Sequence, residues 1–251
     1  MKAKLYILPG SHPCAAVEAA LKLKGIDYRR VDMLPFVQLL WGPIRYGGHT
    51  VPGLRLDGER MVGSRQIVAR LDELVPEPAL YPADAQERER VLDAERWGDE
   101  SLQDATRRVF DVLIVRRPAA LESYAQDANL RVPPALVRPA LGLTARALAA
   151  YNHVSKSTAR ADIESLPPLL DRVDELIADG VIGAGAPNAA DLQIGSSIRL
   201  LDTSGDIRPL LAGRPLSKLI DLFEPAAGDI PAGLLPAEWL PQAGTAQAAP
   251  A

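Results

Sequence analysis

The most constraining feature of this sequence is a short apolar run that two backbone breakers stop just before a helix signal. Residues 4–8 are largely apolar and aromatic, as in a buried strand, and Pro9-Gly10 ends them. Pro13 suits the first turn of a helix, where a missing N–H costs nothing, and apolar residues then recur through Leu23. The stretch therefore predicts a strand that turns directly into an amphipathic helix.

A hydroxyl and a thiol, those of Ser11 and Cys14, lie at this turn. A helix N-terminus offers free N–H groups and a positive dipole end, so the position favours an anion such as a thiolate. The spacing Ser11-x-Pro13-Cys14 resembles the Cys-x-Pro-Cys site of thioredoxin-fold proteins, with serine in place of the exposed cysteine. A plainer interpretation is that Ser11 only caps the helix and that Cys14 is a small buried hydrophobe.

The order of elements after the turn predicts a thioredoxin-like layout within about 75 residues. The sequence favours strands at 27–32, 51–56 and 59–62, an irregular second helix within 33–48, and a helix capped by Ser64 that ends before Pro76. Asp57-Gly58 between two short apolar runs is a strong hairpin signal.

The second half of the chain reads as helical throughout. A proline-rich linker at 76–82 precedes a long helix at 86–115, and further helices are predicted near 118–129, 134–154, 160–178, 188–201 and 216–223. We therefore predict an α/β plus all-α architecture. It comprises a thioredoxin-like, thiol-binding domain at 1–78, an all-helical bundle domain at 84–240, and a disordered tail at 241–251.

Composition narrows the classes of function. The 251 residues carry a formal charge of -4, which does not favour binding to a nucleic acid. There is one cysteine, no apolar run long enough for a membrane span and no spacing typical of a metal site. With no leading apolar segment either, we expect a cytoplasmic protein without metal.

Three further motifs identify the architecture more closely. Val51-Pro52-Gly53-Leu54 and Gly63-Ser64-Arg65-Gln66-Ile67 are similar to the Val-Pro-x-Leu and (Glu/Asp)-Ser-x-x-Ile elements of the glutathione S-transferase family. Asn188-Ala189-Ala190-Asp191 resembles the helix-capping motif of that family's C-terminal domain, in which the two side chains cap reciprocally. In that family the proline is cis, and the backbone of the residue before it pairs with the cysteinyl part of glutathione.

The resemblance implies a transferase of the EC 2.5.1 type, active in detoxification, which activates the thiol of glutathione or of another low-molecular-weight thiol. Ser11 would be the catalytic group, and the thiol ligand would bind at His12, His49, Val51, Pro52, Ser64 and Arg65. Ser64 would hold the γ-glutamyl carboxylate. Trp97, Ser101 and Arg108 would line the pocket for a small hydrophobic electrophile. A homodimer is implied, with no membrane partner, and the shortage of lysine beside arginine hints at a GC-rich bacterial source.

Two departures from the family pattern bear on the thiol. Gly63 stands where an acidic residue usually helps to hold the ligand's amino group, and Thr50 stands where many relatives carry lysine. Two alternatives therefore remain open. One is a thiol-disulfide oxidoreductase with Cys14 as its nucleophile, and the other is a non-enzymatic binding protein of the same fold.

Overall fold

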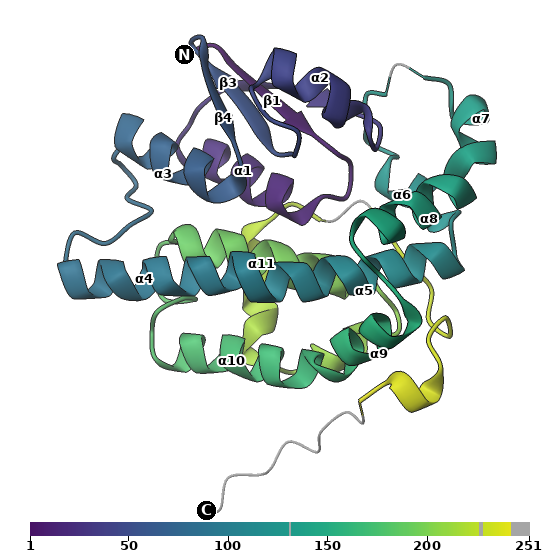
Figure 1. Cartoon of the computed structure of the whole chain (residues 1–251). Coiled ribbons are helices and arrows are strands. Elements are labelled where there is room, and N and C mark those ends of the chain that lie inside the picture. The colour runs from purple at the N-terminus through teal and green to yellow at the C-terminus, as the bar shows by residue number, and fades with distance from the viewer. Residues whose placement is uncertain (131, 226–227, 242–251) are drawn as a thin grey trace, which may run out of the picture.

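The computed structural model describes residues 1–130, 132–225 and 228–241, and it begins with a four-stranded sheet (Figure 1). The strands are β1 (Ala3–Ile7), β2 (Tyr28–Asp32), β3 (Gly53–Leu56) and β4 (Glu59–Val62), in the spatial order β2-β1-β3-β4. β1 pairs in parallel with β2 and antiparallel with β3. This mixed sheet confirms the predicted thioredoxin-like layout.

The helices of this half are α1 (His12–Leu23), α2 (Val37–Arg45) and α3 (Ser64–Leu74). Asp57 and Gly58 have φ values of 48° and 100°, the backbone of a two-residue type I′ hairpin turn. The predicted cap of α3 is wrong by one residue. Gly63, with φ 88°, is the N-cap, so the chain turns before Ser64, which becomes the first helical residue.

A buried lysine fixes the segment between α3 and the next helix. The Lys24 ammonium, whose side chain is wholly buried, lies 2.6 Å from Asp72 Oδ1 and donates to the Pro78 carbonyl oxygen at 2.5 Å. Asp72 Oδ1 also accepts from the Leu80 N–H at 2.7 Å. We propose that the domain boundary lies in this segment, which α1 therefore holds in place.

The second half is helical, with more breaks than the sequence predicts. Its helices are α4 (Ala85–Trp97), α5 (Gln103–Arg116), α6 (Ala120–Tyr124), α7 (Pro134–Val137), α8 (Leu141–Tyr151), α9 (Lys156–Glu164), α10 (Leu166–Ala178) and α11 (Ala189–Asp202). A π-helical turn, Gly98–Leu102, joins α4 to α5, which form one long rod (Figure 1). The predicted single helix at 160–178 is two helices, because Pro167 and Pro168 start a new one.

Other predicted helices are also shorter or tighter. The segment 118–129 contains only α6, the segment 134–154 is divided between α7 and α8, and Pro215–Leu222 is a 3-10 helix. The capping box that begins α11 is confirmed: Asn188 Oδ1 accepts from the Asp191 N–H at 3.1 Å, and Asp191 Oδ2 accepts from the Asn188 N–H at 2.9 Å.

One apolar core runs through both halves of the molecule. Val17 and Leu21 of α1 belong to the same cluster of buried side chains as Ile194 and Ile198 of α11. Helix α1 packs on α3 and on α11, so it lies between the sheet and the helical half. Ser11, immediately before α1, is therefore placed at the junction of the two domains.

Among the described residues, no helix combines the length and the apolar character that a membrane crossing needs. The predicted tail at 241–251 lies, beyond Pro241, outside the described residues.

Candidate functional site

The turn from β1 into α1 is shaped by Gly10. This residue has φ 80°, and a Cβ there would lie 2.9 Å from Tyr124 Cδ1 of the helical half. Any larger residue would be strained and would push the two halves apart. The breaker pair seen in the sequence therefore serves both the turn and the close approach of the domains.

Ser11 is the N-cap of α1, yet its hydroxyl makes no capping bond. Its backbone N–H donates to the Leu8 carbonyl oxygen and its carbonyl oxygen accepts from the Ala15 N–H, each at 3.1 Å, while its side chain interacts with the Cys14 thiol. The side chain is half-buried. A hydroxyl that does not cap the helix remains available to donate to a ligand.

Cys14 lies one turn further on and has a different environment. Its side chain is 1% exposed, and burial raises the pKa of the thiol to about 12, against the smaller, opposing influence of the Ser11 side chain. A thiol with such a pKa is almost wholly protonated at neutral pH, so it is a poor nucleophile. The structure therefore does not support Cys14 as the catalytic group.

Ser11 lies on the wall of a cavity of about 350 Å³ between the two domains. Val51 borders it from the sheet side, while Phe110 of α5 and Leu148 of α8 border it from the helical side. A largely apolar cleft at a domain junction is a usual place for a small-molecule site. It is the cavity in which a group activated by Ser11 could meet an apolar substrate.

Aromatic side chains stand at this cavity. Phe36, the N-cap of α2, has φ 70°, an outlying backbone conformation for a bulky residue. Its ring meets that of Tyr151 edge to face, with the centroids 6.2 Å apart. Residues with strained backbones cluster at functional sites, so the conformation of Phe36 also supports this cavity as the candidate site.

A few polar groups interrupt the apolar lining. His12 is 4% exposed, its Nε2 has no hydrogen-bond partner among the described residues, and burial lowers the pKa of its imidazole, helped by the Arg107 charge. Asp111 is 2% exposed and accepts a hydrogen bond from Asn152. Neither Arg107 nor Asp111 is predicted from the sequence as a site residue, although Asp111 is a charged residue within the apolar run 109–115.

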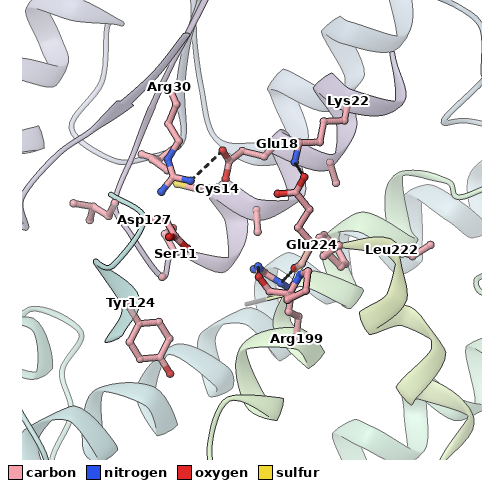
Figure 2. Close-up of a pocket in the computed structure, with 17 residues that line it drawn as sticks. Ser11, Cys14, Glu18, Lys22, Arg30, Tyr124, Asp127, Arg199, Leu222 and Glu224 are labelled. Carbon is pink, nitrogen blue, oxygen red and sulfur yellow. Dashed lines mark hydrogen bonds and ion pairs between the residues drawn. The ribbon is translucent and has the colours of Figure 1, made fainter. Parts of the chain in front are cut away.

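A second cavity, of about 290 Å³, also borders Ser11 and includes Cys14 in its wall (Figure 2). Two ion pairs lie in its wall: Glu18 Oε1 is 3.7 Å from Arg30 Nη1, and Lys22 Nζ is 2.7 Å from Glu224 Oε1. The Arg199 guanidinium donates to the Glu224 carbonyl oxygen at 3.0 Å. Because most of its charged side chains already have protein partners and its wall is more polar than apolar, the second cavity is a weaker candidate for binding an apolar substrate.

The hydroxyl of Ser64 is engaged across the domain junction. It donates to Gln193 Oε1 of α11 at 2.8 Å, and Gln193 Nε2 in turn donates to Gln103 Oε1 at 2.9 Å and to Asp99 Oδ1 at 3.3 Å. Beside it, Arg65 Nε lies 3.7 Å from Glu95 Oε2 of α4. Both side chains therefore contact the helical half in the structure.

The structure brings three of the predicted thiol-binding residues, His12, His49 and Val51, to the cavity with Ser11. The Val51–Pro52 peptide is cis. The residues Pro52, Ser64 and Arg65 are not part of that cavity wall.

The residues predicted for the electrophile pocket are not part of the cavity wall either. Trp97 packs against the core, and Arg108 forms a two-pronged ion pair with Asp162, with its Nε 2.7 Å from Oδ2. Arg107, Phe110 and Asp111 line the cavity instead. The reason is the orientation of α5 about its own axis. Helical spacing in the sequence shows which residues share a face, but not which face meets the other domain. The π turn that contains Ser101 adds a residue between α4 and α5 and so also changes that orientation.

A thioredoxin-like domain followed by a helical domain is the architecture of the glutathione S-transferase fold. Residues 5–79 match the family model described as "Glutathione S-transferase, N-terminal domain". This N-terminal domain is therefore similar to that of the glutathione S-transferase family. No curated protein matches the chain.

Solved structures share the fold over both domains. The beta-etherase LigF from Sphingobium sp. strain SYK-6 has 18% identity and a TM-score of 0.61, over 88% of this chain and 99% of that one. A glutathione S-transferase from Rhodospirillum rubrum F11 has 21% identity and a TM-score of 0.57, over 86% and 84%. One from Methylobacterium radiotolerans, in complex with glutathione sulfonate, has 18% identity and a TM-score of 0.53, over 88% and 89%.

Proposed function

We propose that this protein transfers a low-molecular-weight thiol, with glutathione as the first candidate, to a small hydrophobic electrophile. The observation that carries the proposal is the position of Ser11, which borders an apolar cavity between the domains with a hydroxyl that no helix cap uses. The family match of residues 5–79 and the glutathione sulfonate bound by one structural neighbour support the choice of thiol.

Ser11 would act by donating its hydroxyl hydrogen to the bound thiolate. Lowering a thiol pKa by about two units from roughly 8.5 requires about 3 kcal/mol. A hydrogen bond to a charged sulfur contributes roughly 1.5 to 3 kcal/mol, and a helix N-terminus adds roughly 0.3 to 1. The two effects together are sufficient to hold the thiol as a thiolate at neutral pH.

The rest of the ligand would extend from Ser11 toward the sheet. We propose that the backbone of Val51 pairs with the cysteinyl part and that His12 and His49 border it, because these residues share the cavity with Ser11. At the start of α3, the Ser64 hydroxyl already donates to Gln193. Free backbone N–H groups of the first turn, beside Ser64 and Arg65, would therefore hold a carboxylate.

The proposal can be tested by substituting Ser11 alone. We expect Ser11→Ala to lower kcat/KM for conjugation of glutathione to chlorodinitrobenzene by about tenfold to 100-fold, the loss of one hydrogen bond to a charged atom. The pKa of bound glutathione, followed by thiolate absorbance, should rise toward its value in solution. The matched control is Cys14→Ala at the same turn, which we expect to keep the wild-type rate and pKa.

Calorimetric titration of the wild-type protein with reduced glutathione separates the alternatives. Binding together with turnover that depends on Ser11 supports the transferase. Binding without turnover of any electrophile would favour a non-enzymatic binding protein. Loss of activity in Cys14→Ala but not in Ser11→Ala would overturn the proposed role of Ser11.

A further inference from the structure

A buried carboxyl group faces the same cavity from the helical domain. Asp111 of α5 is 2% exposed and borders the cavity that Ser11 borders from α1. Its Oδ2 accepts a hydrogen bond from Asn152 Nδ2 at 2.6 Å, and its Oδ1 has no donor among the described residues. The proposed chemistry at Ser11 does not use this group.

The surroundings of Asp111 make its carboxyl easier to protonate than that of an exposed aspartate. Burial raises the pKa of its carboxyl to about 6, against the opposing effects of the Asn152 hydrogen bond and the Arg107 charge. The other titratable side chains at the cavity are His12, His49 and Tyr151. An apolar substrate that displaced water from the cavity would raise the pKa of the carboxyl further, because desolvation disfavours the charged form.

We propose that Asp111 is the proton donor for electrophiles whose attack by the thiolate creates an enolate, that is, for α,β-unsaturated carbonyl compounds. This inference rests on the proposed function, since it needs a thiolate in the same cavity. It goes further, because it assigns a role in the reaction to a second group at the cavity, on the helical domain.

The step balances as an addition. The thiolate forms a C–S bond to the β-carbon, the C=C π bond breaks, and its electron pair becomes an enolate on the carbonyl side. The carboxyl of Asp111 gives its proton to that enolate and becomes a carboxylate. It then takes up a proton from solvent, which replaces the one that the thiol released on ionising, so the net change is addition of S–H across C=C.

The competing explanation is a purely structural role, in which the hydrogen bond between Asp111 and Asn152 only holds α5 against α8. A role of that kind would affect every substrate equally, whereas a proton donor matters only where a proton is consumed. Displacement of chloride from chlorodinitrobenzene consumes none, because chloride leaves as a stable anion. The ratio of kcat/KM for benzylideneacetone, an aromatic enone, to that for chlorodinitrobenzene therefore isolates the proton transfer. Both reactions need the same thiolate, so the effect of thiol ionisation on the two rates is equal and does not change the ratio.

The test measures this ratio against pH, with glutathione as the thiol. In the wild-type protein the ratio should fall as the pH rises above about 6, where Asp111 loses its proton. Asp111→Asn keeps an oxygen that can accept from Asn152, and we expect it to lower enone addition by about 100-fold, within the usual range for a general acid, with chloride displacement within about twofold. In this variant the ratio should be independent of pH.

A second variant guards against a folding defect in the first. Asn152→Ala removes the hydrogen bond that stabilises the carboxylate, so the pKa of Asp111 should rise and the fall in the ratio should begin at a higher pH. A parallel loss of both reactions in Asp111→Asn, or a ratio that no variant changes, would overturn the inference while chloride displacement still upheld the transferase. Absence of both reactions in the wild-type protein would overturn the two proposals together.

Discussion

At the scale of single residues, burial decides which group at the first turn can react. Ser11 and Cys14 are three positions apart, yet Ser11 is half-buried at a cavity while Cys14 is 1% exposed, and burial raises the pKa of its thiol to about 12. The same helix N-terminus cannot offset that cost, because its dipole contributes only roughly 0.3 to 1 kcal/mol. A reactive thiol is therefore not expected at this turn.

Alkylation of the single cysteine tests this contrast. At neutral pH about one Cys14 thiol in 10⁵ is ionised, whereas an unfolded cysteine is ionised to a few per cent. We expect iodoacetamide to modify the native protein about 10³-fold more slowly than the urea-unfolded protein, followed by mass spectrometry. Rapid labelling of the folded chain at neutral pH would contradict the burial of this thiol.

At the scale of elements, the way α1 is anchored shows how the domains are held together. Lys24, next to the last residue of α1, is a buried cation that reaches Asp72 of α3 and the carbonyl oxygen of Pro78 beyond it. A buried charge of this kind is costly to leave unpaired. Two helices and the linker segment therefore depend on one ammonium group.

Replacing this lysine should be costly, and a neighbour on the same helix provides the comparison. We expect Lys24→Met to lower the free energy of unfolding by about 3 kcal/mol, because Asp72 would remain largely buried without its cation. The matched variant is Lys22→Met, whose exposed ion pair with Glu224 should contribute less than about 1 kcal/mol. Urea unfolding monitored by circular dichroism measures both, and equal effects would show that the buried pair is not special.

At the scale of the whole molecule, the junction between the domains holds several buried acids. Glu95 of α4 is 2% exposed, accepts a hydrogen bond from the Tyr81 hydroxyl at 3.0 Å and lies near Arg65 of α3. Burial raises the pKa of its carboxyl from 4.5 to about 7, more than these partners lower it. Below about pH 7 the folded protein therefore holds this carboxyl mostly in its protonated form.

Glu95 should make the free energy of unfolding decrease as the pH rises. A carboxyl whose pKa is raised in the folded state stabilises the fold most below its unfolded pKa, and that contribution is lost as the pH rises from 4.5 to about 7. We expect the free energy of unfolding, compared with that of Glu95→Gln, to fall by about 3 kcal/mol over this range. Asp93→Asn, on the exposed face of α4, is the control. An identical pH profile for wild type and Glu95→Gln would contradict the prediction.

Much of the architecture could be predicted because it depends on local chemistry. The Asp57-Gly58 turn, the capping box of Asn188 and Asp191, and the strand that turns into α1 each follow from neighbours in the chain. The ends of helices were less predictable, as at Ser64, because a glycine one residue earlier can complete the turn by itself. The π turn between α4 and α5 has no clear local signal and changed which residues of α5 reach the cavity.

The sequence by itself determined the order of the elements and the serine that immediately precedes α1. Only the tertiary structure decided that Cys14 is buried, that the Ser64 hydroxyl serves Gln193, and that Asp111 rather than Arg108 borders the cavity. The physical reason is that hydrogen-bonding and breaker residues act within a few positions of themselves. Exposure and pKa, in contrast, depend on which distant segment packs against a side chain, and here α11, α5 and α8 come from the far half of the chain.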